Sequence, residues 1–314
     1  MNAPDLFPLF DLNEWIGRQL RAVEGALSSW VADPVCAPAP AGLGNAMRYA
    51  VLDGGKRLRP LLVLAACEAV NGDAALALRA ACAVELIHAS SLVHDDMPCM
   101  DDDVLRRGKP TAHVKFGQAQ ALLAGDALQA LAFEILTGPD AAFTNSHTSA
   151  AVQVRLCRLL AQAAGHQGMA GGQAIDLASV GLALTSAQLH EMHRLKTGAL
   201  LKASVVMGSA CGHPPASVER ALQQYGDAVG LAFQVVDDVL DVTADAATLG
   251  KTVGKDAAQA KPTFVSLMGL PACRHYAATL LEQAQASLGA VHAAGFLNTA
   301  ALHALATMLV DRTH

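Results

Sequence analysis

S-S-L-V-H-D-D-M-P-C-M-D-D-D, residues 90–103, places five carboxylates within nine positions, and Arg106 and Arg107 follow shortly afterwards. Only 16% of the chain is charged, so this concentration of like charge needs a physical reason. Clustered carboxylates repel one another unless a cation lies among them, and Mg²⁺ favours one or two carboxylates together with phosphate oxygens and water. Arginine forks bind phosphate groups. The stretch therefore predicts a magnesium and diphosphate site, with a solvated acidic turn between helices as the alternative.

The rest of the chain has the composition of a large helical core. Its 314 residues are 53% hydrophobic and only 4% aromatic, and alanine is very frequent. Alanine and leucine favour helices, whereas runs of β-branched residues, which favour sheets, are scarce. No shift in composition marks a linker. We therefore expect an all-α fold, a single domain over residues 1–314 that forms a bundle of about ten or more helices around a central active-site cavity.

Several classes of protein are disfavoured by composition. The chain begins without a basic and apolar leader, and no uninterrupted apolar stretch reaches the length of a membrane span, so we expect no membrane insertion. The seven cysteines form no C-x-x-C pair, which favours the reducing cytoplasm over a zinc site or a disulfide framework. A formal net charge of −6 argues against nucleic acid as a partner. The large apolar fraction suggests a homodimer through helical faces.

The acidic stretch lies at the end of a predicted helix that covers about 74–97. The helix dipole is negative at this end, so carboxylates there again imply a cation. Asp95 and Asp101 are six apart and do not share a helical face, but Pro98 should end the helix and let Asp101 turn back beside Asp95. Apolar periodicity predicts further helices at about 11–31, 42–52, 60–70, 111–137, 141–164, 186–211, 216–242 and 263–312.

A second acidic cluster, F-Q-V-V-D-D-V-L-D, occupies residues 233–241. Asp237 and Asp241 are four apart and so share one helical face, where they can bridge a cation. Taken alone, the pair could equally be an exposed helix face. Two such clusters in one helical chain, each followed by basic residues, instead describe a site for two diphosphates. The basic groups are Lys56, Arg57 and Arg59, then Arg106 and Arg107, then Lys251, Lys255 and Lys261.

Motifs of other chemistries were not found. The chain has no G-x-S-x-G, P-loop or H-E-x-x-H, which disfavours acyl transfer, nucleotide hydrolysis and zinc proteolysis. A di-metal carboxylate bundle would need Glu-x-x-His pairs on inward helix faces, and none is evident.

In its motifs the chain resembles the trans-isoprenyl diphosphate synthases of the bacterial farnesyl diphosphate synthase type. The two extra residues in the first aspartate motif, Pro98 and Cys99, resemble those enzymes and also the plant-type geranylgeranyl enzymes. The shared motifs follow the family order over about residues 40–265: G-G-K-R-L-R-P at 54–60, L-I-H at 86–88, D-D-M-P-C-M-D at 95–101 with D-D-V-L-R-R-G-K-P-T after it, L-A-G-D at 123–126, G-G-Q-x-x-D at 171–176, K-T-G at 196–198, the second aspartate cluster, and G-K at 250–251. The resemblance implies an all-helical prenyltransferase that condenses isopentenyl diphosphate with an allylic diphosphate such as dimethylallyl or geranyl diphosphate.

Roles for individual residues are also implied by the resemblance. About three Mg²⁺ ions would bind with the substrate diphosphate, and their ligands would be Asp95, Asp101, Asp237 and Asp241. Residues with catalytic roles would be Lys196, Thr197, Gln234, Arg106, Asp96 and Asp238. Substrate would be bound by Lys56, Arg59, His88, Arg106, Arg107, Lys196, Thr197, Gln234, Lys251 and Lys261. Gln173 and Asp176 would support the site from a neighbouring helix.

Product length depends on the helix that precedes Asp95. One helical turn advances about 5.4 Å, comparable to one isoprene unit, so Ser90 and Ser91 lie near the path of the growing tail. Many of the bacterial farnesyl synthases that the chain resembles have an aromatic residue where this chain has Ser90. We expect a C15 product, with C20 as a close alternative, and a side chain from the helix at about 111–137 could close the tunnel.

Two other functions belong to different classes. A non-catalytic partner subunit of a prenyl synthase would keep the fold, but the intact aspartates, Arg106, Arg107, Lys196 and Thr197 argue against it. A terpene cyclase would also ionise an allylic diphosphate, but the second D-D-x-x-D and the basic isopentenyl site favour condensation.

Overall fold

The computed structural model describes residues 10–33, 38–52, 54–138, 150–182, 184–243 and 263–311, and these form an all-α fold, as predicted. The helices are α1 (Leu12–Trp30), η1 (Pro40–Gly42), α2 (Leu43–Leu52), α3 (Leu58–Ala69), α4 (Ala74–Asp95), α5 (Ala112–Phe116), α6 (Gln118–Thr137), α7 (Ala150–Ala164), α8 (Met169–Ala178), α9 (Ser186–His193), η2 (Arg194–Gly198), α10 (Ala199–Ala210), α11 (Ala216–Thr243), α14 (Phe264–Met268), α15 (Leu270–Ala293) and α16 (Ala300–Val310). A single antiparallel hairpin, β1 (Leu105–Arg106) and β2 (Lys109–Pro110), supplies the strands of the described part.

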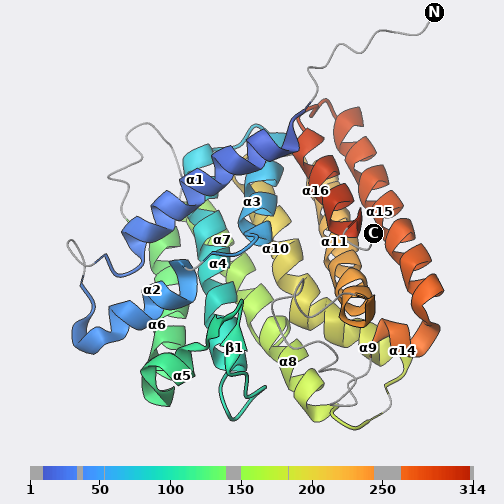
Figure 1. Cartoon of the computed structure of the whole chain (residues 1–314). Coiled ribbons are helices and arrows are strands. Elements are labelled where there is room, and N and C mark those ends of the chain that lie inside the picture. The colour runs from blue at the N-terminus through green and yellow to red at the C-terminus, as the bar shows by residue number, and fades with distance from the viewer. Residues whose placement is uncertain are drawn as a thin grey trace, which may run out of the picture.

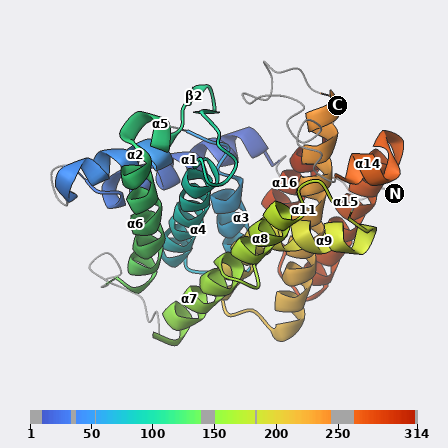
Figure 2. The ribbon, with the colours of Figure 1, turned by 90° about the horizontal axis from the view of Figure 1, so that it is seen from below.

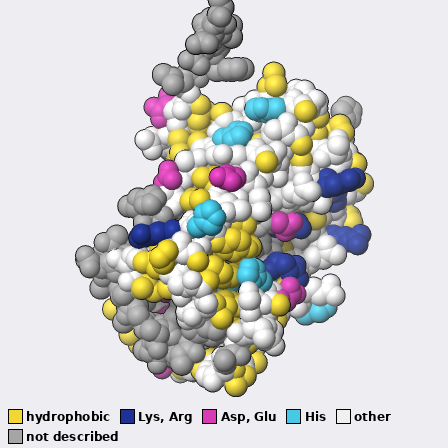
Figure 3. All heavy atoms as spheres, turned by 90° about the vertical axis from the view of Figure 1, so that its right-hand side faces the viewer, with side chains coloured by type: hydrophobic (Ala, Val, Ile, Leu, Met, Phe, Trp, Pro, Cys, Tyr) yellow, Lys and Arg dark blue, Asp and Glu magenta, His cyan; other side chains and the backbone are white. Residues whose placement is uncertain are grey.

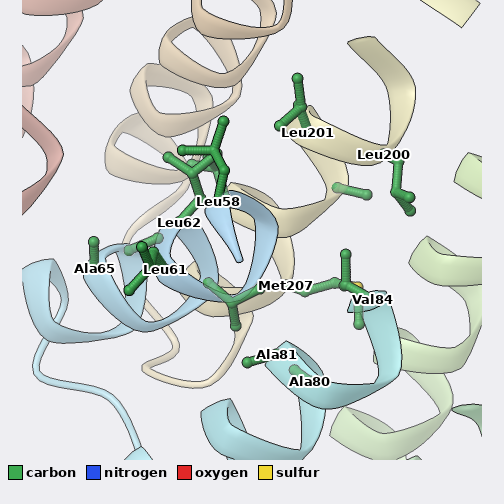
Figure 4. Packing of buried hydrophobic residues seen from close by; sticks show 14 of the residues in the cluster. Leu58, Leu61, Leu62, Ala65, Ala80, Ala81, Val84, Leu200, Leu201 and Met207 are labelled. Carbon is green, nitrogen blue, oxygen red and sulfur yellow. The ribbon is translucent and has the colours of Figure 1, made fainter. Parts of the chain in front are cut away.

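The core forms where α3, α4, α10 and α11 pack side by side. Helix α10 packs against α3 and α11, α4 packs against α3 and α6, and α15 covers α11. Figure 4 shows buried side chains that α3, α4 and α10 contribute to this core, among them the small Ala80 and Ala81 of α4, which are completely buried. Complete burial of each leucine contributes about 2–3 kcal/mol relative to exposure. One hydrophobic cluster extends from Trp15 on α1 to Leu309 on α16.

The two acidic segments lie at the same end of this bundle. Helix α1 crosses its upper end in Figure 1, whereas the hairpin, α8 and α9 lie toward its lower end. Seen from below, the hairpin and α8 border the ends of α4 and α11 (Figure 2). The C-terminal ends of α4 and α11 therefore carry the two aspartate clusters to one region.

Two helices reach the length and hydropathy of a membrane span, which the sequence analysis did not anticipate. They are α4, with 22 residues, and α6, with 20. The most apolar window of α4 is 78% buried, so its apolar surface belongs to the core, whereas the window of α6 is only 39% buried. Leu122 and Leu123 of α6 are about half exposed, at 48% and 52%. By contrast, the face formed by α14 and α15 shows scattered charges among apolar side chains (Figure 3).

Some predicted helices are divided. The helix expected at about 111–137 breaks at Gly117, whose φ of 85° favours glycine. The helix expected at about 186–211 contains a π-helical turn, η2, at Arg194–Gly198. The tail divides into α14, α15 and α16, and part of the helix expected at 141–164 falls outside the described residues.

Candidate active site

Helix α4 ends at Asp95, and the chain then turns back on itself. Pro98 has no N–H to continue the helix. The backbone N–H of Asp101 donates to the carbonyl of Asp95 at 2.9 Å, and Asp103 N–H donates to the Asp96 carbonyl at 3.2 Å. Asp101 thus lies beside Asp95, as the six-residue spacing and Pro98 predicted. Burial raises the pKa of Asp95 to about 6, Lys196 opposes this rise, and the charge of Asp101 adds to it.

The hairpin after this turn fixes the two arginines. Arg107 and Gly108 both have positive φ, at 53° and 74°, as a two-residue hairpin turn with the twist of its strands requires. Arg106 donates from Nε and Nη2 to the carboxylate of Asp96 at 2.6–2.9 Å, and Asp96 is only 3% exposed. Asp96 therefore holds Arg106 against the end of α4. Arg107 donates to the carbonyl of Gly54.

The basic loop before α3 is held by buried ion pairs. Arg57 is 3% exposed and binds Glu24 and Glu85 at 2.7 Å each, as well as the carbonyl of Val51. Burial would lower the pKa of Arg57, but the hydrogen bonds and charges of Glu24 and Glu85 raise it overall. Arg57 thus anchors the loop, while Lys56 next to it is exposed.

Arg59 and His88 lie next to the basic loop and line the cavities described below. Burial lowers the pKa of Arg59 to about 10, although the charge of Glu85 opposes it. Burial, reinforced by the positive charges of Arg59 and Arg107, lowers the pKa of His88 well below its ordinary value. His88 is therefore neutral near pH 7.

Lys196 and Thr197 are placed by the π-helical turn η2. The turn packs against α8 so closely that a Cβ on Gly172 would overlap the Lys196 backbone nitrogen. Lys196 Nζ donates to the carboxylate of Asp176 on α8. Single π turns often occur at functional sites because they re-aim side chains within a helix. Here the turn brings Lys196 and Thr197 toward the aspartates.

A polar cavity of about 550 Å³ lies between these elements. Its wall includes most of the predicted site residues: Arg59, His88, Asp95, Asp101, Arg106, Arg107, Lys196, Thr197, Gln234, Asp237, Asp238 and Asp241. A second, mainly apolar cavity of about 430 Å³ shares Arg59, His88, Asp95, Lys196 and Thr197 with it, so the two adjoin. A polar chamber thus opens onto an apolar one at the end of α4.

The carboxylates fit Mg²⁺ better than a metal that needs a complete protein cage. Among the described residues, no three acidic, histidine or cysteine side chains form a ready metal-binding group. Asp95, Asp101, Asp237 and Asp241 line one polar cavity instead. Mg²⁺ takes oxygen ligands and commonly keeps waters and substrate phosphates in its coordination sphere. Such an ion would be held by carboxylates from both clusters together with a bound diphosphate.

The family model for polyprenyl synthetase matches residues 40–294. The chain belongs to the polyprenyl synthetase family. Members of this family are prenyltransferases, so the predicted family and enzyme class are confirmed.

The chain is similar to several proteins of this family whose names state a prenyl diphosphate product or substrate. The chain is 53% identical over 243 residues to a probable farnesyl diphosphate synthase of Sinorhizobium fredii, covering 76% of this chain and 71% of that protein. It is 45% identical over 282 residues to geranylgeranyl pyrophosphate synthase 11 of Arabidopsis thaliana, covering 89% of this chain and 77% of that one. It also matches a geranyltransferase of Helicobacter pylori, solved with magnesium and isoprenyl diphosphate, with a TM-score of 0.81 and 33% identity over 97% of this chain and 100% of that chain.

A few predicted residues of this polyprenyl synthetase lie elsewhere. Lys251 and Lys261 lie outside the described residues, as does Lys255. Lys56 and Asp96 do not line the polar cavity. Asp102, Asp103, Thr263 and His193 line it but were not predicted. Asp102 and Asp103 continue the first acidic stretch, and this was the sequence signal that could have found them. No sequence signal pointed to His193 or Thr263.

Proposed function

We propose that the chain is a head-to-tail prenyltransferase that makes farnesyl diphosphate from isopentenyl diphosphate and an allylic diphosphate. One observation carries this proposal: two aspartate clusters and Arg59, Arg106, Arg107 and Lys196 share one polar cavity, which adjoins an apolar one. Diphosphates suit the charged chamber, and a prenyl tail suits the apolar one. The names of the bacterial and plant relatives support the same chemistry.

The basic residues would divide the two diphosphates between them. Arg106 and Lys196 lie near enough to Asp95 for their charges to act on it, and they would bind the allylic diphosphate. Arg59, His88 and Arg107, which gather near the basic loop, would bind isopentenyl diphosphate, with Lys56 at its edge. Arg57 would keep that loop in place without touching substrate, because its guanidinium is committed to Glu24 and Glu85. We further propose that Lys251 and Lys261 assist at the allylic diphosphate.

The reaction would proceed by ionisation of the allylic carbon–oxygen bond. Bound Mg²⁺, about three ions, would neutralise the charge that develops on the departing diphosphate. Arg106 and Lys196 would stabilise the same charge, while Thr197 and Gln234 would face the positive allylic carbon. The double bond of isopentenyl diphosphate would attack that carbon, a carbon–carbon bond would form, and the released diphosphate would accept the proton that is lost. No side-chain base is needed.

Product length would be set in the apolar cavity. Ser90 is 5% exposed and lines this cavity with Ser91, and Gln129 of α6 lies on its wall. Gln129 is thus the side chain from the predicted helix at about 111–137 that could limit the tunnel. We propose a C15 product, with C20 as the alternative that the plant relative favours.

Assay of the purified chain with isopentenyl and dimethylallyl diphosphates and Mg²⁺ tests the proposal. We expect farnesyl diphosphate, identified by chain-length analysis, and no product when a chelator removes the metal. Mainly C20 product would overturn the C15 assignment. Absence of elongation would support a non-catalytic subunit, and cyclic hydrocarbon from farnesyl diphosphate would support a terpene cyclase.

Proposals about domain organisation, partners and location rest on the core, the exposed apolar side chains, the net charge and the cysteines. We propose a single domain, supported by the continuous hydrophobic cluster from α1 to α16, and a homodimer, supported by the exposed leucines of α6. Because a dimer interface would account for that apolar surface, we propose no membrane insertion. The negative net charge supports the absence of a nucleic-acid partner. The six described cysteines are free thiols, which supports a reducing cytoplasmic location.

A further inference from the structure

The side chain of Gln234 lies between a hydroxyl and a carboxylate. Thr197 Oγ1 donates to Gln234 Oε1 at 3.0 Å, and Gln234 Nε2 donates to Asp238 Oδ1 at 2.8 Å. A glutamine amide has a donor end and an acceptor end, whereas an ionised carboxylate only accepts hydrogen bonds. Asp238 therefore requires the NH₂ group of Gln234 on its own side. The carbonyl oxygen must then point toward Thr197 and the polar cavity.

Asp238 cannot easily turn away from this position. Its other oxygen, Oδ2, accepts from the backbone N–H of Phe264 at 2.7 Å, and Asp238 is 3% exposed. Phe264 is completely buried and packs against the rings of His190, His193 and Tyr276. The backbone at the start of α14 thus holds the carboxylate of Asp238, and that carboxylate in turn orients the amide of Gln234.

We propose that Asp238 is a positioning residue that orients the Gln234 amide so that its carbonyl oxygen faces the reacting allylic carbon. This inference rests on the proposed prenyl transfer, in which that carbon becomes positive as the carbon–oxygen bond breaks. A carbonyl oxygen is the negative end of the amide dipole and stabilises such a charge, whereas a reversed amide would present its N–H groups. Asp238 accepts at Oδ1 from Gln234 and at Oδ2 from Phe264, so it acts through Gln234 rather than through a metal.

Asp238→Asn tests the orientation with little change of shape. The asparagine oxygen can still accept from Phe264 N–H, but its NH₂ group cannot accept from Gln234 and allows the amide to turn round. We expect kcat to fall about 10²-fold, the usual effect of losing one aligned dipole. The KM for isopentenyl diphosphate should stay within about 3-fold of wild type, because the proposed binding residues of that substrate are Arg59, His88 and Arg107.

A second substitution should restore the correct polarity. In the double variant Asp238→Asn with Gln234→Glu, the introduced glutamate can accept from both the introduced asparagine and Thr197, and it again presents an oxygen to the allylic carbon. Gln234→Glu alone places two carboxylates in contact and should be impaired. We expect the double variant to exceed Asp238→Asn in kcat by at least about 10-fold, a coupling that independent sites would not show. Loss of packing alone would not be repaired by exchanging the two groups.

The outcomes separate this inference from the proposed function. An inactive wild-type chain would overturn the proposed function itself. An active wild type whose Asp238→Asn variant keeps kcat within about 3-fold, or whose double variant is no better than Asp238→Asn, would overturn the orientation alone. Thermal unfolding checks that each variant folds. Should Asp238→Asn fail to fold, comparison of the double variant with Gln234→Glu decides: recovery supports the orientation, and no recovery overturns it.

Discussion

Replacement of Asp95 by asparagine should stabilise the metal-free protein while removing its activity. Burial raises the pKa of Asp95 to about 6 from an ordinary 3.8, so the folded chain binds a proton more tightly than the unfolded chain. The ionised carboxylate therefore destabilises the fold, fully above about pH 6 and not at all below about pH 4. The difference between the two pKa values corresponds to about 3 kcal/mol, and solvent screening reduces this to roughly 1–2 kcal/mol.

Thermal unfolding in the presence of a chelator measures this effect. At pH 8 the Tm of Asp95→Asn should exceed that of wild type by roughly 2–5 °C, and at pH 4 the difference should vanish. With Mg²⁺ and an unreactive allylic diphosphate analogue the order should reverse, because these ligands stabilise only a protein that binds them. Activity should fall by about 10²-fold or more, since the chain loses a carboxylate that would hold Mg²⁺ against the charge developing on the diphosphate.

Asp102→Asn is the matched control for this measurement. Asp102 is exposed in the same turn, and its φ of 48° suits asparagine as well as aspartate. This substitution removes one negative charge, as Asp95→Asn does, but from an exposed side chain, so the Tm in chelator should change by less than about 1 °C. A lower Tm for Asp95→Asn at pH 8, or an equal increase at pH 4 and pH 8, would refute the argument that burial of this carboxylate is costly.

Three further substitutions test the tunnel, the basic loop and the π turn. Ser90→Tyr should shorten any C20 product toward C15 by chain-length analysis, since Ser90 lines the apolar cavity; an unchanged product would place the floor elsewhere. Arg57→Met should lower the free energy of unfolding by about 3–5 kcal/mol in denaturant titrations, because Glu85 is left buried and unpaired. Adding Glu85→Gln to the same chain should recover part of this loss. A loss below about 1 kcal/mol would contradict the anchoring role of Arg57. Gly172→Ala should lower kcat by about 10²-fold, because its Cβ would displace Lys196, whereas Gly289→Ala, where the helix has open space, should leave kcat unchanged.

The helices were largely predictable because apolar periodicity records which face is buried. The segment expected at about 74–97 is the helix Ala74–Asp95, and the one expected at about 216–242 is Ala216–Thr243. The divisions within helices were not predictable, because they arise from packing between segments distant in the sequence. Gly230 of α11 lies close enough to Gly198 that an added Cβ would be 3.0 Å from its Cα, next to the π turn. The strands of the hairpin have two residues each, too few for an alternating pattern.

The candidate site was predictable as a set of residues but not as a set of contacts. The family resemblance placed Asp96 and Asp238 among the residues with catalytic roles, and each directly follows a predicted metal ligand. Consecutive residues of a helix point about 100° apart, so the second member of each pair cannot point in the same direction as the first.

The structure gives the second aspartate of each pair a separate task. Asp95, Asp237 and Asp238 line the polar cavity, and Asp96 does not. Asp96 binds the guanidinium of Arg106, and Asp238 binds the amide of Gln234. In both pairs the second carboxylate is only 3% exposed and aligns a neighbouring side chain. Buried carboxylates are costly unless their hydrogen bonds are satisfied, and these two are satisfied by groups that themselves reach the cavity. Under the proposed function, the first aspartate of each pair would hold a metal ion. The second would align Arg106 toward a phosphate in one cluster and Gln234 toward the allylic carbon in the other.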